Sequence, residues 1–172
     1  MRERVVDFTT PFWDDHLVAV MKKRHRTQFQ IHSFENLADQ STVKYGILDS
    51  GTVKQMFRYS QVPVYRRMWQ QMMDETISSW VATTQQGLQR VLASSDEQPW
   101  AFVTQSSSVT YYARQRCDLD VIMDELPFRS AAMAVPINSP YRVRLILAIL
   151  VMTENQELHM LRSKWFPQRD CD

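Results

Sequence analysis

The sequence predicts an α/β domain, because short apolar runs alternate along the chain with segments whose apolar residues recur at helical spacing. The composition agrees with a globular domain. Of 172 residues, 44% are hydrophobic and 23% are charged, which is enough apolar material to bury a core. The sequence holds no internal repeat and no low-complexity tract. We therefore expect sheets covered by helices rather than a disordered chain.

Strands are expected where apolar runs are too short to form helices. Residues 17–21 are five consecutive apolar residues of mixed branching, a length that favours a strand. The basic stretch 22–26 that follows could bind nucleic acid, but a solvated junction is the preferred interpretation, because nothing else in the chain supports that function. The remaining predicted strands cover residues 4–8, 43–47, 100–103 and 133–135.

Helices are expected behind capping signals. Ser33 is placed to cap a short helix over residues 34–40, and Gln86 follows Thr83 at the spacing of a capping box. A serine followed by proline at the first helical position predicts the start of a long apolar helix over residues 139–152. The other predicted helices cover residues 52–60, 64–73, 106–116 and 156–165.

The balance of charge and the length of the apolar runs limit the possible partners. The formal net charge is +1, from 20 basic and 19 acidic residues, so no overall field would draw the chain onto nucleic acid. The longest apolar run, 145–152, is far shorter than the roughly 20 residues that cross a bilayer. Charged residues stand at 2–4, where a secretory signal would need an apolar centre. Either the chain is intracellular or its beginning is missing.

The sequence shows no grouping typical of an enzyme, a metal site or a cofactor site. Two cysteines and four histidines are scattered without ligand spacing, and three glycines are too few for a dinucleotide-binding loop. The apolar face of residues 64–73 is expected to pack in the core instead of forming a cofactor box. We expect neither catalysis nor a bound metal or cofactor.

The helix predicted over residues 52–60 is a candidate binding element, because it begins directly after the turn 49–51. Its first backbone N–H groups are unpaired within the helix, and such groups attract anions. The run Tyr45-Gly46-Ile47-Leu48-Asp49-Ser50-Gly51-Thr52 resembles the strand, turn and helix start of the second lobe in ionotropic glutamate receptors, with a kainate-type character. After this run the resemblance continues in order through residues 68–69, 84–91, 101–102, 115–117, 139–142, 158–160 and 164–165. Before it, residues 2–8 and 11–12 also resemble the family.

This resemblance implies a two-lobed clamshell, similar to periplasmic binding proteins, that closes on an amino acid and pulls on the linkers of a pore. Residues 33–135 would form a nearly complete second lobe. Residues 1–32 would hold the end of a first-lobe segment and the junction where the pore would lie. Residues 136–172 would be the C-terminal helices that return to a first lobe that is only partial. The pore segments of the family are absent between Lys23 and Ile31.

The resemblance also implies four ligand-binding residues. Arg2 matches the arginine whose guanidinium grips the ligand α-carboxylate with two parallel hydrogen bonds. Thr52 and Val53 occupy the helix-start positions that hold ligand carboxylates, although Val53 offers only its N–H and no hydroxyl. Gln105 stands where the family has a glutamate that pairs with the ligand ammonium, and it brings no charge. Weakened or altered amino-acid binding is therefore expected, the alternative being an ordinary helix start and a solvated arginine.

Cys117 and Cys171 match the pair that forms a disulfide in the family, joining the second lobe to the C-terminal tail. In the chain-entropy model a loop of that length contributes roughly 4 kcal/mol, provided the compartment is oxidising. Two free thiols are the alternative.

The function implied by the resemblance is that of a fragment of a receptor subunit: the ligand-binding region of a ligand-gated cation channel. Its ligand would be glutamate or a related amino acid, and the complete protein would assemble with other subunits in a tetramer. The binding region would lie on the extracellular side of the plasma membrane, at a synaptic or sensory membrane. Two alternatives stay open, a free-standing amino-acid-binding clamshell protein and a non-signalling truncated product. A partial sheet exposes strand edges and apolar faces, so we expect the isolated chain to be poorly soluble.

Overall fold

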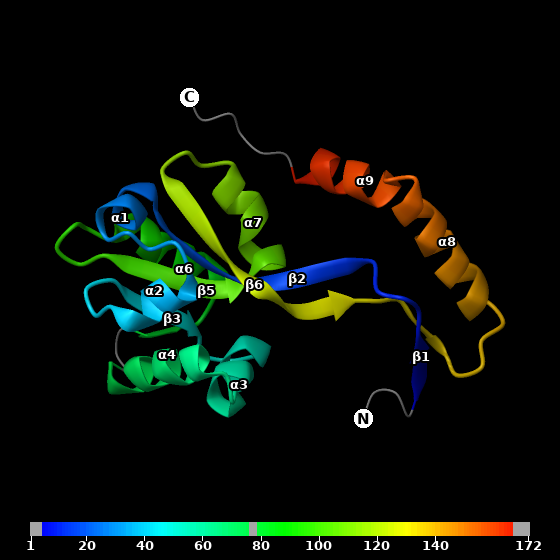
Figure 1. Ribbon diagram of the computed structural model, residues 1–172, viewed down its shortest axis with the longest axis horizontal. Helices are drawn as coiled ribbons and strands as arrows, with labels where there is room; N and C mark the ends of the chain where they lie inside the picture. The colour runs from blue at the N-terminus through cyan, green and yellow to red at the C-terminus, as the bar shows by residue number, and fades with distance from the viewer. Residues whose placement is uncertain (1–4, 76–78, 167–172) are drawn as a thin grey trace.

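The structure is a computed structural model that describes residues 5–75 and 79–166 and consists of alternating strands and helices (Figure 1). In chain order the strands are β1 (Val6–Phe8), β2 (Trp13–Lys22), β3 (Lys44–Leu48), β4 (Trp80–Val81), β5 (Trp100–Gln105), β6 (Leu119–Ala131) and β7 (Ala134–Pro136). The helices are α1 (Lys23–Gln28), α2 (Phe34–Asp39), α3 (Thr52–Tyr59), α4 (Pro63–Asp74), α6 (Thr84–Ala93), α7 (Ser106–Arg114), α8 (Arg142–Glu154) and α9 (Glu157–Trp165). The predicted α/β class is confirmed.

Five strands form the main sheet, in the order β4-β3-β5-β2-β6. β3 is parallel to both β4 and β5, whereas β2 runs antiparallel to β5 and β6. Because β2 lies inside this sheet, residues 13–22 belong to the same packed body as β3, β5 and β6. The boundary expected at residue 32 therefore does not separate two structural units.

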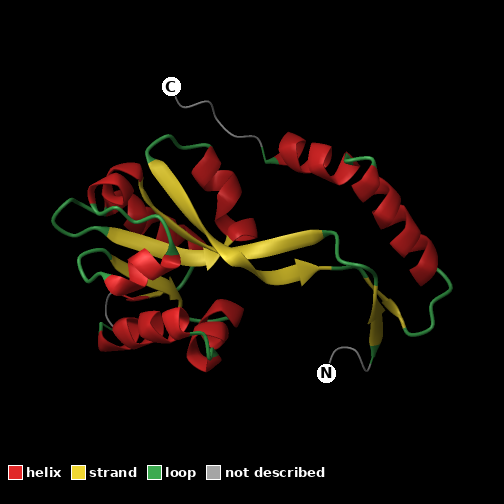
Figure 2. Ribbon diagram, viewed as in Figure 1, coloured by secondary structure: helices red, strands yellow, loops and turns green. Residues whose placement is uncertain are grey.

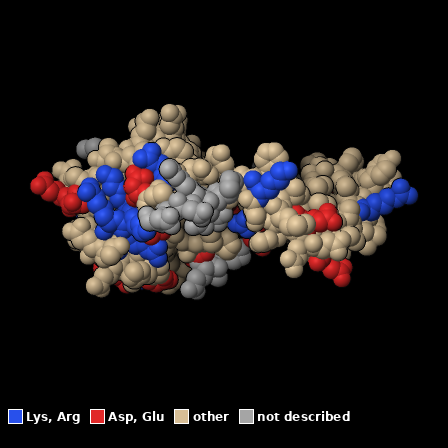
Figure 3. Space-filling view, turned by 90° about the horizontal axis from the view of Figure 1, so that it is seen from above, with Lys and Arg blue, Asp and Glu red and all other residues tan. Residues whose placement is uncertain are grey.

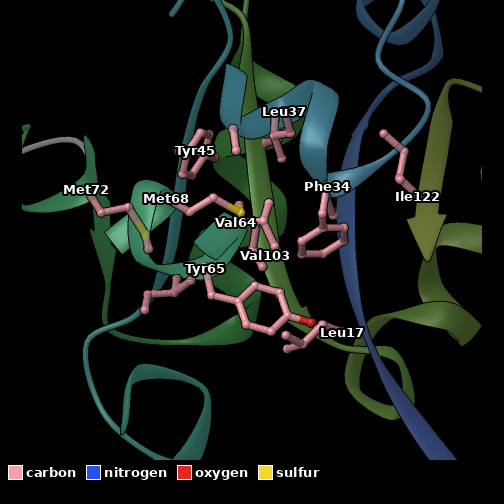
Figure 4. Packing of buried hydrophobic residues seen from close by; sticks show 14 of the residues in the cluster. Leu17, Phe34, Leu37, Tyr45, Val64, Tyr65, Met68, Met72, Val103 and Ile122 are labelled. Atoms are coloured by element: carbon pink, nitrogen blue, oxygen red, sulfur yellow. The ribbon is translucent and has the colours of Figure 1, made fainter. Parts of the chain in front are cut away.

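Different helices cover the two faces of the sheet. Leu17, Ala19 and Met21 of β2 join a buried cluster with residues of α2, α3 and α4, shown in Figure 4. Val18 and Val20 face the other way and pack with residues of α6 and α7. Successive side chains of a strand point to opposite faces, so a central strand covered on both sides is apolar at every position. This explains the uninterrupted apolar run in β2.

A smaller body lies at the other end of the molecule. β1 and β7 pair antiparallel there, and α8 and α9 pack against each other. The long strands β2 and β6 connect the larger body to this end, as Figure 2 shows. Several apolar side chains of α8 are exposed: Val143, Leu147, Leu150 and Val151. None of the helices within the described residues is long and apolar enough to cross a membrane.

The stretch 22–26, expected to be a solvated junction, forms the end of β2 and most of α1; Lys23 and Arg24 are exposed, but His25 is buried. Its contacts come from segments distant in the sequence: the His25 ring is buried, with Nε2 3.2 Å from Asp96 Oδ1, and Arg26 Nη1 donates to Asp120 Oδ2 at 2.6 Å. Basic side chains gather, with acidic ones among them, over the end of the molecule that holds α1 (Figure 3). These partners could not be read from the basic stretch itself.

Two further differences concern the C-terminal half. The strand β6 was not predicted. It is an edge strand of the main sheet and pairs with β2 along much of its length. It contains Pro127, opposite His16 at a register irregularity, and proline within sheets is largely confined to edge strands and bulges. The helix expected from residue 139 begins only at Arg142, since Ser139 N–H donates to the Pro136 carbonyl at 3.1 Å and forms a turn first.

Candidate functional site

Two loops that precede helices meet at one edge of the main sheet. β3 and β5 are adjacent and parallel, with Gly46 opposite Phe102, so their carboxyl ends lie at the same edge. β3 leads through a short turn into α3, and β5 leads directly into α7. In open α/β sheets ligands bind in the crevice outside the carboxyl ends of such strands. The structure thus brings Thr52 and Val53 to the edge at which Gln105 lies.

The start of α3 offers backbone N–H groups that no side chain caps. Gly51 is the N-cap residue, with φ 89° and ψ −168°, a conformation that glycine adopts without strain. It has no side chain, and no side-chain capping hydrogen bond is made. The first N–H groups of a helix lack intrahelical partners and attract anions. The start of α3 is therefore suited to hold a carboxylate.

Thr52 and Val53 differ in what they present at this helix start. Thr52 is half-buried, whereas the Val53 side chain is 4% exposed and packs in the cluster that includes Phe57. Val53 can therefore offer a ligand its N–H alone. Lys54 of α3 stabilises the turn that precedes the helix. Its Nζ donates to Asp49 Oδ1 at 2.6 Å and to the Asp49 carbonyl at 3.1 Å.

Gln105 ends β5 and is also the N-cap residue of α7. Its backbone is extended, with φ −78° and ψ 140°, and its side chain makes no capping hydrogen bond. The residue is half-buried and lies opposite Leu17 of β2. An amide in this position can accept a hydrogen bond from an ammonium group but adds no charge.

The start of α7 is capped instead by Asp15 of β2. Ser106 Oγ donates to Asp15 Oδ1 at 2.5 Å, Ser107 N–H donates to the same oxygen at 2.9 Å, and Ser107 Oγ donates to Asp15 Oδ2 at 2.7 Å. Asp15 was not predicted from the sequence. The serines at the start of the predicted helix were the available signal, but their acidic partner lies 91 residues away.

A second group of polar contacts, made by His16, Asp124 and Tyr65, lies next to β6. His16 Nδ1 lies 3.1 Å from the Asp124 carbonyl oxygen, and the Tyr65 hydroxyl of α4 donates to the Asp124 carboxylate. Burial, followed by the hydrogen bond to Asp124, raises the pKa of the Tyr65 hydroxyl, so Tyr65 stays neutral and acts as a donor. This contact joins α4 to β6 beside the candidate site.

Three of the predicted site residues cannot be placed at this edge. Arg2 and Cys171 lie outside the described residues. Cys117 lies in the turn between α7 and β6, away from the carboxyl ends of β3 and β5. Its pairing with Cys171 stays a prediction. Within the described residues, no group of three His, Cys, Asp or Glu side chains could hold a metal ion.

Comparison with known proteins gives kainate-type glutamate receptor subunits among the relatives, although no family model matches the chain. "Glutamate receptor ionotropic, kainate 5" of Homo sapiens is 33% identical over 146 residues, which are 85% of this chain and 14% of that protein. "Glutamate receptor ionotropic, kainate 1" of Rattus norvegicus is 31% identical over 146 residues, or 15% of its length. The chain thus spans about one seventh of the length of these relatives.

A solved structure gives the same result for the fold. "Drosophila muscle GluRIIB complex with glutamate" superposes with a TM-score of 0.72 and 28% identity, covering 98% of this chain and 64% of that one. Together with the helix starts at the carboxyl edge of β3 and β5, this match defines a clamshell-type ligand-binding domain. The chain belongs to the ionotropic glutamate receptor family and corresponds to part of its ligand-binding domain.

Proposed function

We propose that this chain binds glutamate or a related amino acid at the carboxyl edge of β3 and β5. The observation that carries the proposal is the uncapped start of α3, which lies at the same edge as Gln105. The ligand carboxylate would accept hydrogen bonds from the N–H groups of Thr52 and Val53. Its ammonium group would lie toward Gln105. The similar GluRIIB structure is a complex with glutamate, which supports this choice of ligand.

We further propose that binding is weaker than in a site with a second hydroxyl and a carboxylate. Val53 is buried and contributes no hydroxyl, and Gln105 contributes no charge. The loss of one hydrogen bond to a charged group costs on the order of 1.5–3 kcal/mol, which is more than tenfold in affinity. Arg2 would hold the other side of the ligand carboxylate, as the resemblance implies.

The proposal extends to the complete protein from which such a region would come. It would be a ligand-gated cation channel of the plasma membrane, with this region on the extracellular side and other subunits completing a tetramer. Cys117 and Cys171 would be joined in a disulfide, and the site would bind its ligand without catalysis. The free-standing binding protein and the non-signalling product are the alternatives. The test is glutamate-gated current from the full subunit. A current that is lost on substitution of Thr52 would support the receptor and argue against both alternatives.

Glutamate titration of the chain by calorimetry tests the binding proposal. We expect saturable binding that becomes tighter by about tenfold or more in Gln105→Glu, because a carboxylate would then face the ammonium group. Gln89→Glu is the matched control, since it adds the same charge on an exposed part of α6. Equal effects of the two substitutions would contradict the proposal. So would a result in which none of the three proteins binds glutamate.

A further inference from the structure

We infer that Asp15 is a positioning and specificity residue of the amino-acid site: it fixes the start of α7 and supplies, beside Gln105, the negative charge that selects ligands with an ammonium group. The inference rests on the proposed function, because it concerns the same site. Nothing in the sequence pattern of the binding residues points to Asp15. It is identified by its contacts.

The carboxylate of Asp15 is held against the two residues that follow Gln105. Both of its oxygens accept hydrogen bonds, Oδ1 from Ser106 Oγ at 2.5 Å and Ser107 N–H at 2.9 Å, and Oδ2 from Ser107 Oγ at 2.7 Å. In addition, the backbone N–H of His16 donates to Ser106 Oγ at 3.3 Å. A side chain with several such contacts has little rotational freedom, so its charge is fixed in position.

The position of this charge is set by the pairing of β2 with β5. Leu17 lies opposite Gln105, and the strands run antiparallel, so Asp15 lies beyond the last paired residue of β5, where β2 is paired with β6 alone. Adjacent Cα atoms are about 3.8 Å apart, which places a carboxylate bonded to Ser106 within a few ångströms of the Gln105 backbone. On the side of β6, Arg129 lies opposite Asp15 in the strand register, and His16 Nδ1 of β2 lies 3.1 Å from the backbone carbonyl oxygen of Asp124.

The two helix starts at this edge consequently differ in charge. The N-terminus of α7 already holds a carboxylate from its own chain, whereas the N-terminus of α3 has no side-chain cap. An anionic group is therefore repelled from α7 and attracted to α3. A zwitterionic ligand is oriented by this difference, with its carboxylate toward Thr52 and its ammonium group toward Asp15 and Gln105.

Asp14 provides a matched control within the same strand. It is exposed, and Ser130 Oγ donates to its Oδ1 at 2.6 Å. Neighbouring residues of a strand point to opposite faces. Asp14→Asn therefore removes one negative charge from the chain, as Asp15→Asn does, without touching the start of α7.

The test compares glutamate with glutarate, which has the same two carboxylates and no ammonium group. Calorimetric titration of the 172-residue chain gives the ratio of the two affinities. In Asp15→Asn we expect glutamate to bind about tenfold more weakly, while glutarate binds equally well or more tightly, because only the ammonium group loses its partner charge. Asp14→Asn should leave both affinities unchanged.

A purely structural role for Asp15 predicts a different result. If Asp15 serves only to cap α7, its substitution weakens glutamate and glutarate by the same factor, and the inference is overturned. Ser107→Ala separates the two roles even if Asp15→Asn does not fold, because it weakens the cap and keeps the carboxylate. We expect the ratio of glutamate to glutarate affinity to stay unchanged in Ser107→Ala. A large fall of this ratio in Ser107→Ala would also overturn the inference.

The outcome for the unsubstituted chain distinguishes this inference from the function on which it rests. If the chain binds neither ligand, the proposed function fails and the inference fails with it. If the chain binds glutamate and the ratio does not respond to Asp15→Asn, the inference alone fails.

Discussion

Substitution of Gly51 by alanine should damage both the stability of the chain and its ligand site. Gly51 has φ 89° and ψ −168°, and a Cβ atom built there meets no other atom within 4 Å. The cost is therefore conformational and not steric. For residues other than glycine, this backbone conformation costs on the order of 1–3 kcal/mol of conformational free energy. For a domain of this size each kcal/mol corresponds to about 2–4 °C in Tm.

Urea denaturation of Gly51→Ala, with glutamate titration of the same protein, measures both consequences. We expect the free energy of unfolding to fall by about 1–3 kcal/mol and glutamate binding to weaken, because relaxation of the turn moves the N–H groups of Thr52 and Val53. Ser50→Ala is the control, being exposed and adjacent in the same turn. An unchanged free energy of unfolding in Gly51→Ala would refute the reasoning, since it would mean that the turn adopts another conformation without cost.

Four further perturbations test other parts of the molecule. Thr83→Ala should lower the free energy of unfolding by about 1 kcal/mol in urea denaturation, because Thr83 Oγ1 accepts from Gln86 N–H at 3.1 Å; a change below a few tenths would argue against that cap. Burial is the main cause that raises the pKa values of Tyr45 and Tyr65 above their usual 10.0, so the stability they contribute is present below pH 10 and is lost as the pH rises. Denaturation from pH 8 to 11 should show this loss, and replacement of both tyrosines by phenylalanine should reduce it. Thiol titration of unfolded, oxidised chain should detect no free thiol if Cys117 and Cys171 are paired, and two if they are not. Light scattering should show self-association driven by the exposed apolar residues of α8, which aspartate substitutions there should reduce; a monodisperse monomer would contradict this.

Features set by neighbouring residues could be predicted from the sequence. Ser33 Oγ accepts from Asn36 N–H at 3.2 Å, so the predicted cap of α2 is confirmed. Thr83 caps α6 as expected, while the Gln86 side chain bonds the Ala82 N–H at 2.7 Å, one residue before the usual partner in a capping box. The apolar run 17–21 is a strand because five residues cannot make a stable helix.

Features set by distant partners could not be predicted. β6 mixes apolar and charged residues with a proline, so no period of two marks it as a strand. α1 is held by contacts with Asp96 and Asp120, far along the chain. The same limit applies to the candidate site: the resemblance to the receptor family identified Thr52 and Gln105. Asp15, whose bonded serines lie more than 90 residues away, became visible only in the structure.

The most direct test is a glutamate titration followed by amide chemical shifts in a two-dimensional NMR spectrum of the isotopically labelled chain. We expect saturable shifts of the amides of Thr52, Val53 and Ser106, at the edge shared by β3 and β5. Asp15→Asn should preserve the shifts at the start of α3 and reduce those near α7. Absence of saturable shifts at Thr52 and Val53, or shifts confined to another part of the molecule, would contradict the assignment of the amino-acid site to this edge.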